Sequence, residues 1–204
     1  MTFPSDFHHI FQPGTSPEAP LLLLHGTGGN ENDLPGLAQT VAPGRSFLSV
    51  RGKVLENGMP RFFRRFTEGR FDEDDIRLRA AELAAFVRGA QAQYGFAAPV
   101  ALGYSNGANI AAALLVLEPD LLSGAVLLRA MAPFKDMPKT TLPGTPVMLL
   151  SGQVDPMIPL AEANRLVATL QSSGAKVTQH ILPTGHGLTQ TDLAHMTRYF
   201  SGEE

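Results

Sequence analysis

The motif glycine–x–serine–x–glycine at 103–107 is the segment of this sequence best suited to chemistry. It reads Gly-Tyr-Ser-Asn-Gly, with the serine at position 105. The apolar segment 99–104 leads up to the serine and has the length of a strand. The apolar segment 106–117 follows the serine and has the length of a helix. Such a turn exposes the hydroxyl of Ser105 at a helix N-terminus, where the helix dipole favours developing negative charge.

A serine hydroxyl needs a base that takes its proton, and after such a turn an acid and then a histidine follow along the chain. Asp155 follows the apolar segment 146–151, and His186 follows the segment 176–182. The carboxyl ends of parallel strands meet at one edge of a sheet. The sequence therefore predicts that His186 takes the proton of Ser105 and that Asp155 orients the histidine ring.

Two other carboxylates compete with Asp155 for this role. Asp136 follows the preceding strand, 124–128, but Asp155 lies one strand–helix unit before His186 and is preferred for that reason. Asp192 comes after the histidine, on an expected helix, and is not favoured. A metal site is not expected, because no histidine pair has the spacing of metal ligands.

Backbone N–H groups that could stabilise an oxyanion are expected in two segments. One belongs to the residue after the nucleophile, Asn106. The other is expected in the glycine-rich segment 24–30, Leu-His-Gly-Thr-Gly-Gly-Asn, where Thr27 is the preferred donor. His25 is expected to brace this segment. A nucleotide-binding loop is not expected, because Glu31 stands where the third glycine of that motif belongs.

Composition excludes several classes of protein. The 204 residues are 44% hydrophobic and 17% charged, as in globular proteins. The absence of cysteine excludes disulfides, cysteine zinc sites, iron–sulfur clusters and thiol nucleophiles. The net charge of −3 argues against a nucleic-acid partner. With no long apolar run and no visible signal peptide, we expect no membrane span and one cytoplasmic domain over residues 1–204.

Alternating apolar runs and helical patterns predict an α/β fold. We expect a mostly parallel sheet of six or seven strands, with helices on both faces and no separate cap domain. The expected strands are 20–25, 46–50, 99–104, 124–128, 146–151 and 176–182, with a possible antiparallel edge strand at 8–12. The expected helices are 33–41, a helix from 75 to about 94, 106–117, 160–173 and 190–200.

The segment 51–71 shows no clear periodicity and is expected to be a long loop that could line a pocket. It carries six basic and two acidic residues. Its arginines could contact an anionic substrate or pair with the acidic cluster 72–75, and the pairing is favoured. Arg129, which follows a strand, is a candidate contact for an acidic substrate group. The full set of candidate pocket residues is Met59, Phe62, Phe63, Phe66, Arg129 and Met131.

With these motifs placed, the chain resembles the α/β-hydrolase superfamily. Within it, the chain is similar to the small bacterial phospholipase/carboxylesterase family, which has dienelactone-hydrolase-like relatives. The matching segments are 24–34, 103–108, 151–159 and 185–188, and the resemblance covers about 19–200. It implies that Ser105, Asp155 and His186 form a catalytic triad, that no cofactor is needed, and that the protein is often a homodimer.

The favoured function is a serine carboxylesterase that hydrolyses small carboxylic esters through an acyl-enzyme. The first alternative changes the leaving group and gives a thioesterase, a lysophospholipase or another deacylase. The second is a hydrolase-like scaffold that binds a ligand without turnover, since fold does not dictate function. In each case the partner is a small molecule.

Overall fold

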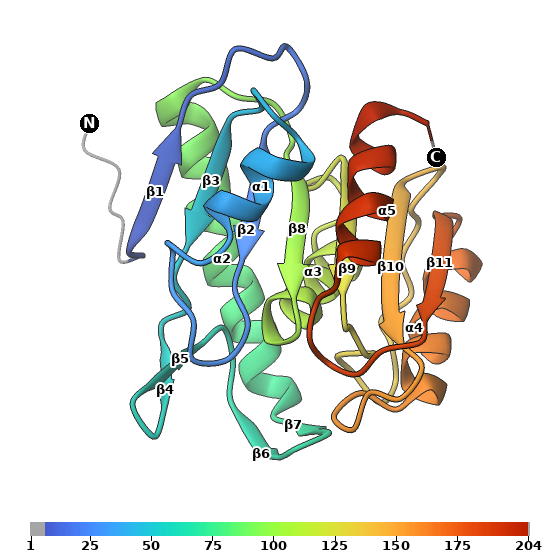
Figure 1. Ribbon diagram of the computed structural model, residues 1–204. Helices are drawn as coiled ribbons and strands as arrows, with labels where there is room; N and C mark the ends of the chain where they lie inside the picture. Colours follow the sequence, from blue (N-terminus) through green and yellow to red (C-terminus); the bar gives the residue numbers. More distant parts are fainter. Residues whose placement is uncertain (1–6, 204) are drawn as a thin grey trace.

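A seven-stranded sheet forms the centre of the protein, shown in Figure 1 as a computed structural model that describes residues 7–203. The strand order is β1-β3-β2-β8-β9-β10-β11, and every neighbouring pair is parallel except β1 and β3. The strands are β1 (His9–Gln12), β2 (Leu21–Leu24), β3 (Phe47–Val50), β8 (Val100–Tyr104), β9 (Gly124–Leu128), β10 (Pro146–Gly152) and β11 (Lys176–Leu182). The expected sheet is thereby confirmed, including its antiparallel edge strand.

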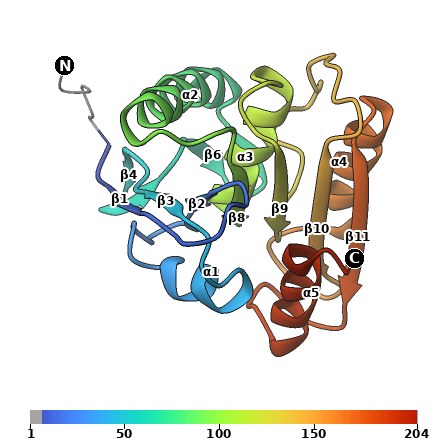
Figure 2. The same cartoon turned by 90° about the horizontal axis from the view of Figure 1, so that it is seen from above.

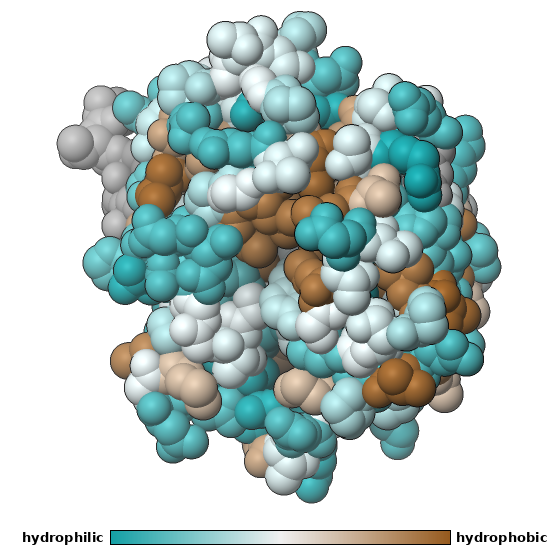
Figure 3. All heavy atoms as spheres, in the orientation of Figure 1, coloured by the Kyte–Doolittle hydropathy of each residue, from teal (hydrophilic) through white to brown (hydrophobic). Residues whose placement is uncertain are grey.

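In the described part of the chain, five helices cover the two faces of the sheet, and Figure 2 shows them from above. They are α1 (Pro35–Val41), α2 (Glu73–Tyr94), α3 (Asn106–Leu117), α4 (Leu160–Ser172) and α5 (Gln190–Ser201). α2, α3 and α4 pack on one face, and their buried residues belong to the larger apolar cluster. α1 and α5 cover the other face, and Figure 3 shows apolar residues at the surface between them.

The inner strands are continuous apolar runs because both of their faces are covered. All four residues of β2 are fully buried. The register pairs Leu24 with Gly103 on one side and with Val50 on the other. β8 is thus the fourth of seven strands, and the turn that follows it lies at the middle of the sheet edge.

Polar side chains set the first turn of α2. Asp72 is the N-cap, and its Oδ1 accepts a hydrogen bond from the Asp75 N–H at 3.1 Å. The helix ends at Gly95, whose φ of 71° is left-handed. Within residues 7–203, no helix is both long enough and apolar enough to cross a membrane.

The segment 51–71 is not the loop expected from sequence. It folds into two β-hairpins, β4 (Val54–Glu56) with β5 (Met59–Arg61) and β6 (Arg65–Thr67) with β7 (Arg70–Phe71). Strands of two or three residues are too short to show a period of two, which is why the pattern gave no strand signal. Figure 1 places both hairpins at the end of the sheet where the parallel strands terminate.

Candidate active site

Ser105 occupies a strained turn between β8 and α3. Its φ is 52° and its ψ is −111°, a conformation that non-glycine residues rarely adopt. The two motif glycines are required by their surroundings. A Cβ at Gly103 would lie 2.6 Å from the Gly107 carbonyl oxygen, and a Cβ at Gly107 would overlap the Leu24 carbonyl oxygen. The turn can therefore form only if these two positions lack side chains.

The carboxyl ends of β8, β10 and β11 bring three side chains into contact. His186 Nε2 lies 3.0 Å from Ser105 Oγ, and His186 Nδ1 lies 2.8 Å from Asp155 Oδ2. Because a carboxylate only accepts hydrogen bonds, Nδ1 carries the ring proton and Nε2 is left as an acceptor for the serine hydroxyl. This arrangement can withdraw a proton from Ser105 and stabilise the resulting imidazolium.

The Asp155 carboxylate is fixed by its own loop. Its Oδ1 accepts hydrogen bonds from the backbone N–H groups of Met157 at 2.8 Å and Ile158 at 3.1 Å, and its side chain is 1% exposed. Gly152, at the end of β10, lets this loop approach the histidine loop, because a Cβ there would overlap the Gly185 carbonyl oxygen. Oδ2 is thereby held for His186.

Two backbone N–H groups near the serine are free to bind an oxyanion. Asn106 is the first residue of α3, and Thr27 follows β2. Among the described residues, neither N–H donates a hydrogen bond. The Thr27 loop is held from β5: the Gly28 N–H donates to the Pro60 carbonyl at 2.9 Å, and Arg61 Nη1 donates to Thr27 Oγ1 at 2.7 Å.

His25 braces the same loop, as expected. It is 1% exposed, and its Nδ1 lies 2.6 Å from the Gly26 carbonyl oxygen. The Gly52 N–H donates to its Nε2 at 3.0 Å, which fixes the neutral tautomer with the proton on Nδ1. Burial lowers the pKa of His25 below its ordinary value, although the Gly26 carbonyl opposes that shift.

Ser105 lines the smaller of two cavities that share part of their lining. The smaller, about 30 Å³, is lined by Ser105, Asn106 and Thr27 among others. The larger, about 570 Å³, extends between the β6–β7 hairpin and the loops at 131–135 and 156–159. The residues that line both are Glu68, Gly69, Phe71, Met131 and Met157. A ligand at the serine could therefore extend into the larger space.

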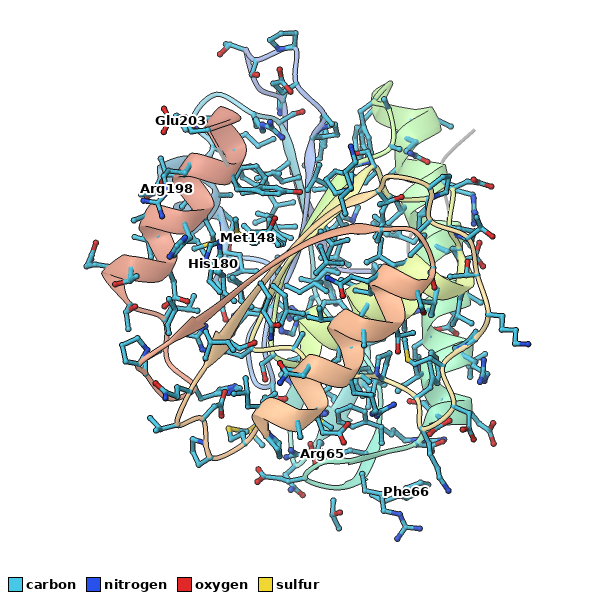
Figure 4. The ribbon with its side chains drawn as sticks, turned by 90° about the vertical axis from the view of Figure 1, so that its right-hand side faces the viewer. Arg65, Phe66, Met148, His180, Arg198 and Glu203 are labelled. Atoms are coloured by element: carbon cyan, nitrogen blue, oxygen red, sulfur yellow. The ribbon has the colours of Figure 1, made fainter. Side chains whose placement is uncertain are left out.

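Of the expected pocket residues, Met131 lines both cavities and the others line neither. Phe62 and Phe63 are buried in the larger apolar cluster, so they support the hairpins from inside. Met59 and Phe66 are 40% and 63% exposed. Figure 4 shows Phe66 at the outer margin of the molecule. The sequence pattern identified apolar residues but could not tell which side of a hairpin they face.

The structure contradicts the expectation that Arg129 contacts an acidic group of the substrate. Its side chain is fully buried and forms a paired contact with Asp192, with Nη1 at 2.8 Å from Oδ1 and Nη2 at 3.0 Å from Oδ2. It also donates to the carbonyl oxygens of Gly185 at 3.0 Å and Gly187 at 2.9 Å. It therefore cannot meet a substrate, and instead it holds the backbone on both sides of His186.

Asp192, which the sequence did not favour, shares this positioning role. Burial would raise the pKa of its carboxyl, but hydrogen bonds from Arg129 and Thr189 outweigh burial and hold that pKa below its ordinary value. Thr189 and Asp192 also form the capping box of α5, and the sequence Thr-x-x-Asp at a helix start is the signal that could have located it. No local pattern connects it to Arg129, 63 residues away.

Arg51 pairs with Glu31, and three other arginines of 51–71 pair with two further sets of carboxylates. Arg64 pairs with Asp72 at 3.1 Å and lies 3.6 Å from Asp75, as expected. Arg61 and Arg65 pair instead with Glu56, at 3.1 Å and 3.0 Å. Both of these latter arginines also line the small cavity beside the serine.

A family model and a named relative both match this chain over most of its length. The family model for Phospholipase/Carboxylesterase matches residues 6–202. A Bacillus subtilis (strain 168) protein named "Putative hydrolase MhqD" is 43% identical over 194 residues, which cover 94% of this chain and 96% of that protein.

Two solved structures of carboxylesterases are similar to this chain in fold and in sequence. A carboxylesterase from Bacillus cereus has a TM-score of 0.95 and 45% identity, covering 98% of this chain and 96% of its own. A carboxylesterase from Mesorhizobium loti has a TM-score of 0.91 and 32% identity, covering 96% of this chain and 95% of its own. With a family model matched over almost its whole length, this α/β hydrolase belongs to the phospholipase/carboxylesterase family.

Proposed function

We propose that this protein is a serine carboxylesterase of small carboxylic esters, with Ser105 as nucleophile, His186 as general base and Asp155 as the orienting acid. The observation that carries the proposal is the continuous contact from Ser105 Oγ to His186 Nε2 and from His186 Nδ1 to Asp155 Oδ2, at 3.0 Å and 2.8 Å.

In the proposed reaction, His186 removes the Ser105 proton as Oγ attacks the ester carbonyl carbon. The carbonyl oxygen becomes an oxyanion that accepts hydrogen bonds from the N–H groups of Thr27 and Asn106. His186 then gives its proton to the leaving alcohol, which departs and leaves an acyl group on Ser105. A water molecule, deprotonated by His186, hydrolyses this acyl-enzyme and restores the serine.

The small cavity favours a short acyl group or a small leaving group close to the serine. Its volume is about 30 Å³, whereas that of the larger cavity is about 570 Å³. The 570 Å³ cavity beyond it could receive the remainder of a larger substrate, so longer-chain alternatives such as a lysophospholipase are also tested.

Steady-state hydrolysis of p-nitrophenyl acetate, butyrate and octanoate by the wild type and by Ser105→Ala tests the proposal. We expect turnover that is fastest with the short esters and that falls by roughly 10⁴-fold or more in Ser105→Ala. Faster turnover of octanoate would favour the longer-chain alternatives. No turnover of any ester by a folded wild type would contradict the esterase proposal and favour the ligand-binding scaffold.

A further inference from the structure

Two arginines line the same small cavity as Ser105, although neither takes part in the proposed reaction. Arg61 belongs to β5 and Arg65 begins β6, so the two hairpins bring them together. The side chain of Arg61 is 3% exposed and that of Arg65 is 18% exposed. Arginines this buried must find carboxylates or other acceptors, because an unpaired buried charge is costly.

The nearby carboxylates do not bind all of the N–H donors of the two arginines. Both cations share Glu56, which is 29% exposed. Glu68, which also lines the cavity, is 3.5 Å from Arg65 Nη1, but it is 65% exposed and its charge is screened by water. Among the described residues, the Nη2 group of neither arginine donates a hydrogen bond. Of the two carboxylates beside the arginines, only Glu56 is partly buried.

The two guanidinium groups repel each other. The pKa of Arg61 lies below its ordinary value, because burial and then the neighbouring Arg65 disfavour its charged form, and Glu56 opposes both effects only in part. An added anion beside the two guanidinium groups would relieve this repulsion.

The cavity wall next to the arginines is also rich in donors. Asn106 is 2% exposed, its Oδ1 accepts from the Phe62 N–H at 2.7 Å, and its buried Nδ2 has no hydrogen-bond partner. Asn109 lines the cavity too and uses its Oδ1 for the Met131 N–H at 2.9 Å. Both asparagines are thus committed as acceptors, which leaves their amide N–H groups as donors.

We propose that this donor-rich wall is an anion subsite, and that the substrates of this enzyme are short esters that also carry a carboxylate within reach of Arg65. The proposal rests on the esterase function proposed above and assigns its substrate class. A planar carboxylate matches the paired donors of a guanidinium group, and charge-assisted hydrogen bonds of this kind are about twice as strong as neutral ones.

Matched ester pairs test the subsite on either side of the scissile bond. On the leaving-group side we would compare meta-acetoxybenzoate with meta-acetoxybenzamide, and on the acyl side monomethyl glutarate with the methyl ester of its monoamide. The two members of each pair have nearly the same shape, and only one of them carries a negative charge. At neutral pH we expect kcat/KM to be about tenfold higher for the carboxylate member of one pair, and that pair shows which side reaches the subsite.

Three variants locate the effect. Arg65→Gln should bring the carboxylate-to-amide ratio of kcat/KM to near one, and Arg65→Lys, which keeps the charge, should retain part of it. Arg64→Gln is the matched control, because it removes the same charge from the adjacent residue, whose side chain is 61% exposed and pairs with Asp72. This control should keep the wild-type ratio. A ratio near one in both wild-type pairs, or an unchanged ratio in Arg65→Gln, would overturn the proposal.

Equilibrium binding separates this proposal from the esterase function. Calorimetric titration of Ser105→Ala with meta-acetoxybenzoate and its amide needs no turnover. We expect the carboxylate to bind about tenfold more tightly, and this difference to vanish in the double variant with Arg65→Gln. Equal affinity of the two ligands would refute the anion subsite even if phenyl acetate is hydrolysed. Unequal affinity without any hydrolysis would support the subsite and refute the esterase function.

Discussion

Replacing Asp192 with asparagine should damage both stability and activity, although this residue never touches the substrate. The Asp192 side chain is fully buried. It accepts two hydrogen bonds from Arg129, one from the Thr189 N–H at 2.7 Å and one from the Thr189 hydroxyl at 2.8 Å. An amide has nearly the same shape, but it removes the negative charge and turns one acceptor into a donor that faces the guanidinium.

The magnitude follows from the charge that is left behind. In Asp192→Asn the Arg129 guanidinium is buried without a counter-charge, and breaking a buried pair in this way costs about 3–5 kcal/mol. For a chain of this size that loss lowers Tm by roughly 10 °C. Because the wild-type carboxyl has a depressed pKa, its stabilising effect is present above its unfolded pKa, about 3.9, and is lost as the pH falls through the lower folded value.

A double variant separates stability from positioning. Arg129→Met with Asp192→Leu replaces the pair with apolar side chains of similar volume, which in other buried pairs restores stability. It does not restore the donors to the Gly185 and Gly187 carbonyl oxygens on either side of His186. We therefore expect much of the stability to return while kcat stays low.

Urea unfolding and steady-state kinetics on the wild type, Asp192→Asn and the double variant provide the measurement. Two results would refute the reasoning. One is a loss of less than about 1 kcal/mol in Asp192→Asn, which would mean that water or rearrangement satisfies Arg129. The other is full recovery of kcat in the double variant, which would mean that these hydrogen bonds do not position His186.

Three further predictions concern the turn, the histidine brace and the acid. Gly107→Ala should lower the free energy of unfolding by about 3 kcal/mol or more, because the new Cβ would overlap the Leu24 carbonyl oxygen. Gly36→Ala, which has open space around it in α1, should raise the free energy of unfolding by about 0.5–1 kcal/mol. Equal urea midpoints for the two variants would contradict this. Because the pKa of His25 is lowered in the folded protein, the unfolded state binds a proton at higher pH than the folded state does. The urea midpoint should therefore fall as the pH drops below about 6.5, and it should fall less in His25→Gln. Parallel pH curves for the two proteins would contradict the lowered pKa of His25. Asp155→Asn should stay folded by circular dichroism and lower kcat by roughly 10⁴-fold, because the histidine then holds the wrong tautomer; near-normal kcat would place the orienting acid elsewhere.

Local constraints explain what the sequence could predict. The motif around Ser105 could be recognised from sequence because nearby backbone atoms leave no space for a Cβ at its two glycines. These atoms belong to the same strand–turn–helix unit or to the adjacent strand. The positions of Asp155 and His186 follow from strand ends and chain order. The continuous apolar strands likewise predicted the sheet, which the structure confirms.

Long-range contacts explain what the sequence could not predict. Arg129 follows a strand, like the residues of the candidate site, but its direction depends on Asp192, 63 residues later. The hairpins of 51–71 have strands too short for a periodic signal, so neither the buried Phe63 nor the cavity-lining Arg65 could be distinguished from its neighbours. The catalytic roles, the homodimer and the cytoplasmic location stay predictions.

The most direct test of the central claim is labelling with a fluorophosphonate, followed by mass spectrometry of the intact protein and of its peptides. A serine activated by a histidine attacks the phosphorus atom and stays covalently modified. We predict one label per chain, on Ser105, with none on Ser105→Ala and much slower labelling of His186→Ala. Absence of the label from a folded wild type, or its presence on a different residue, would contradict the proposal that Ser105 is the nucleophile.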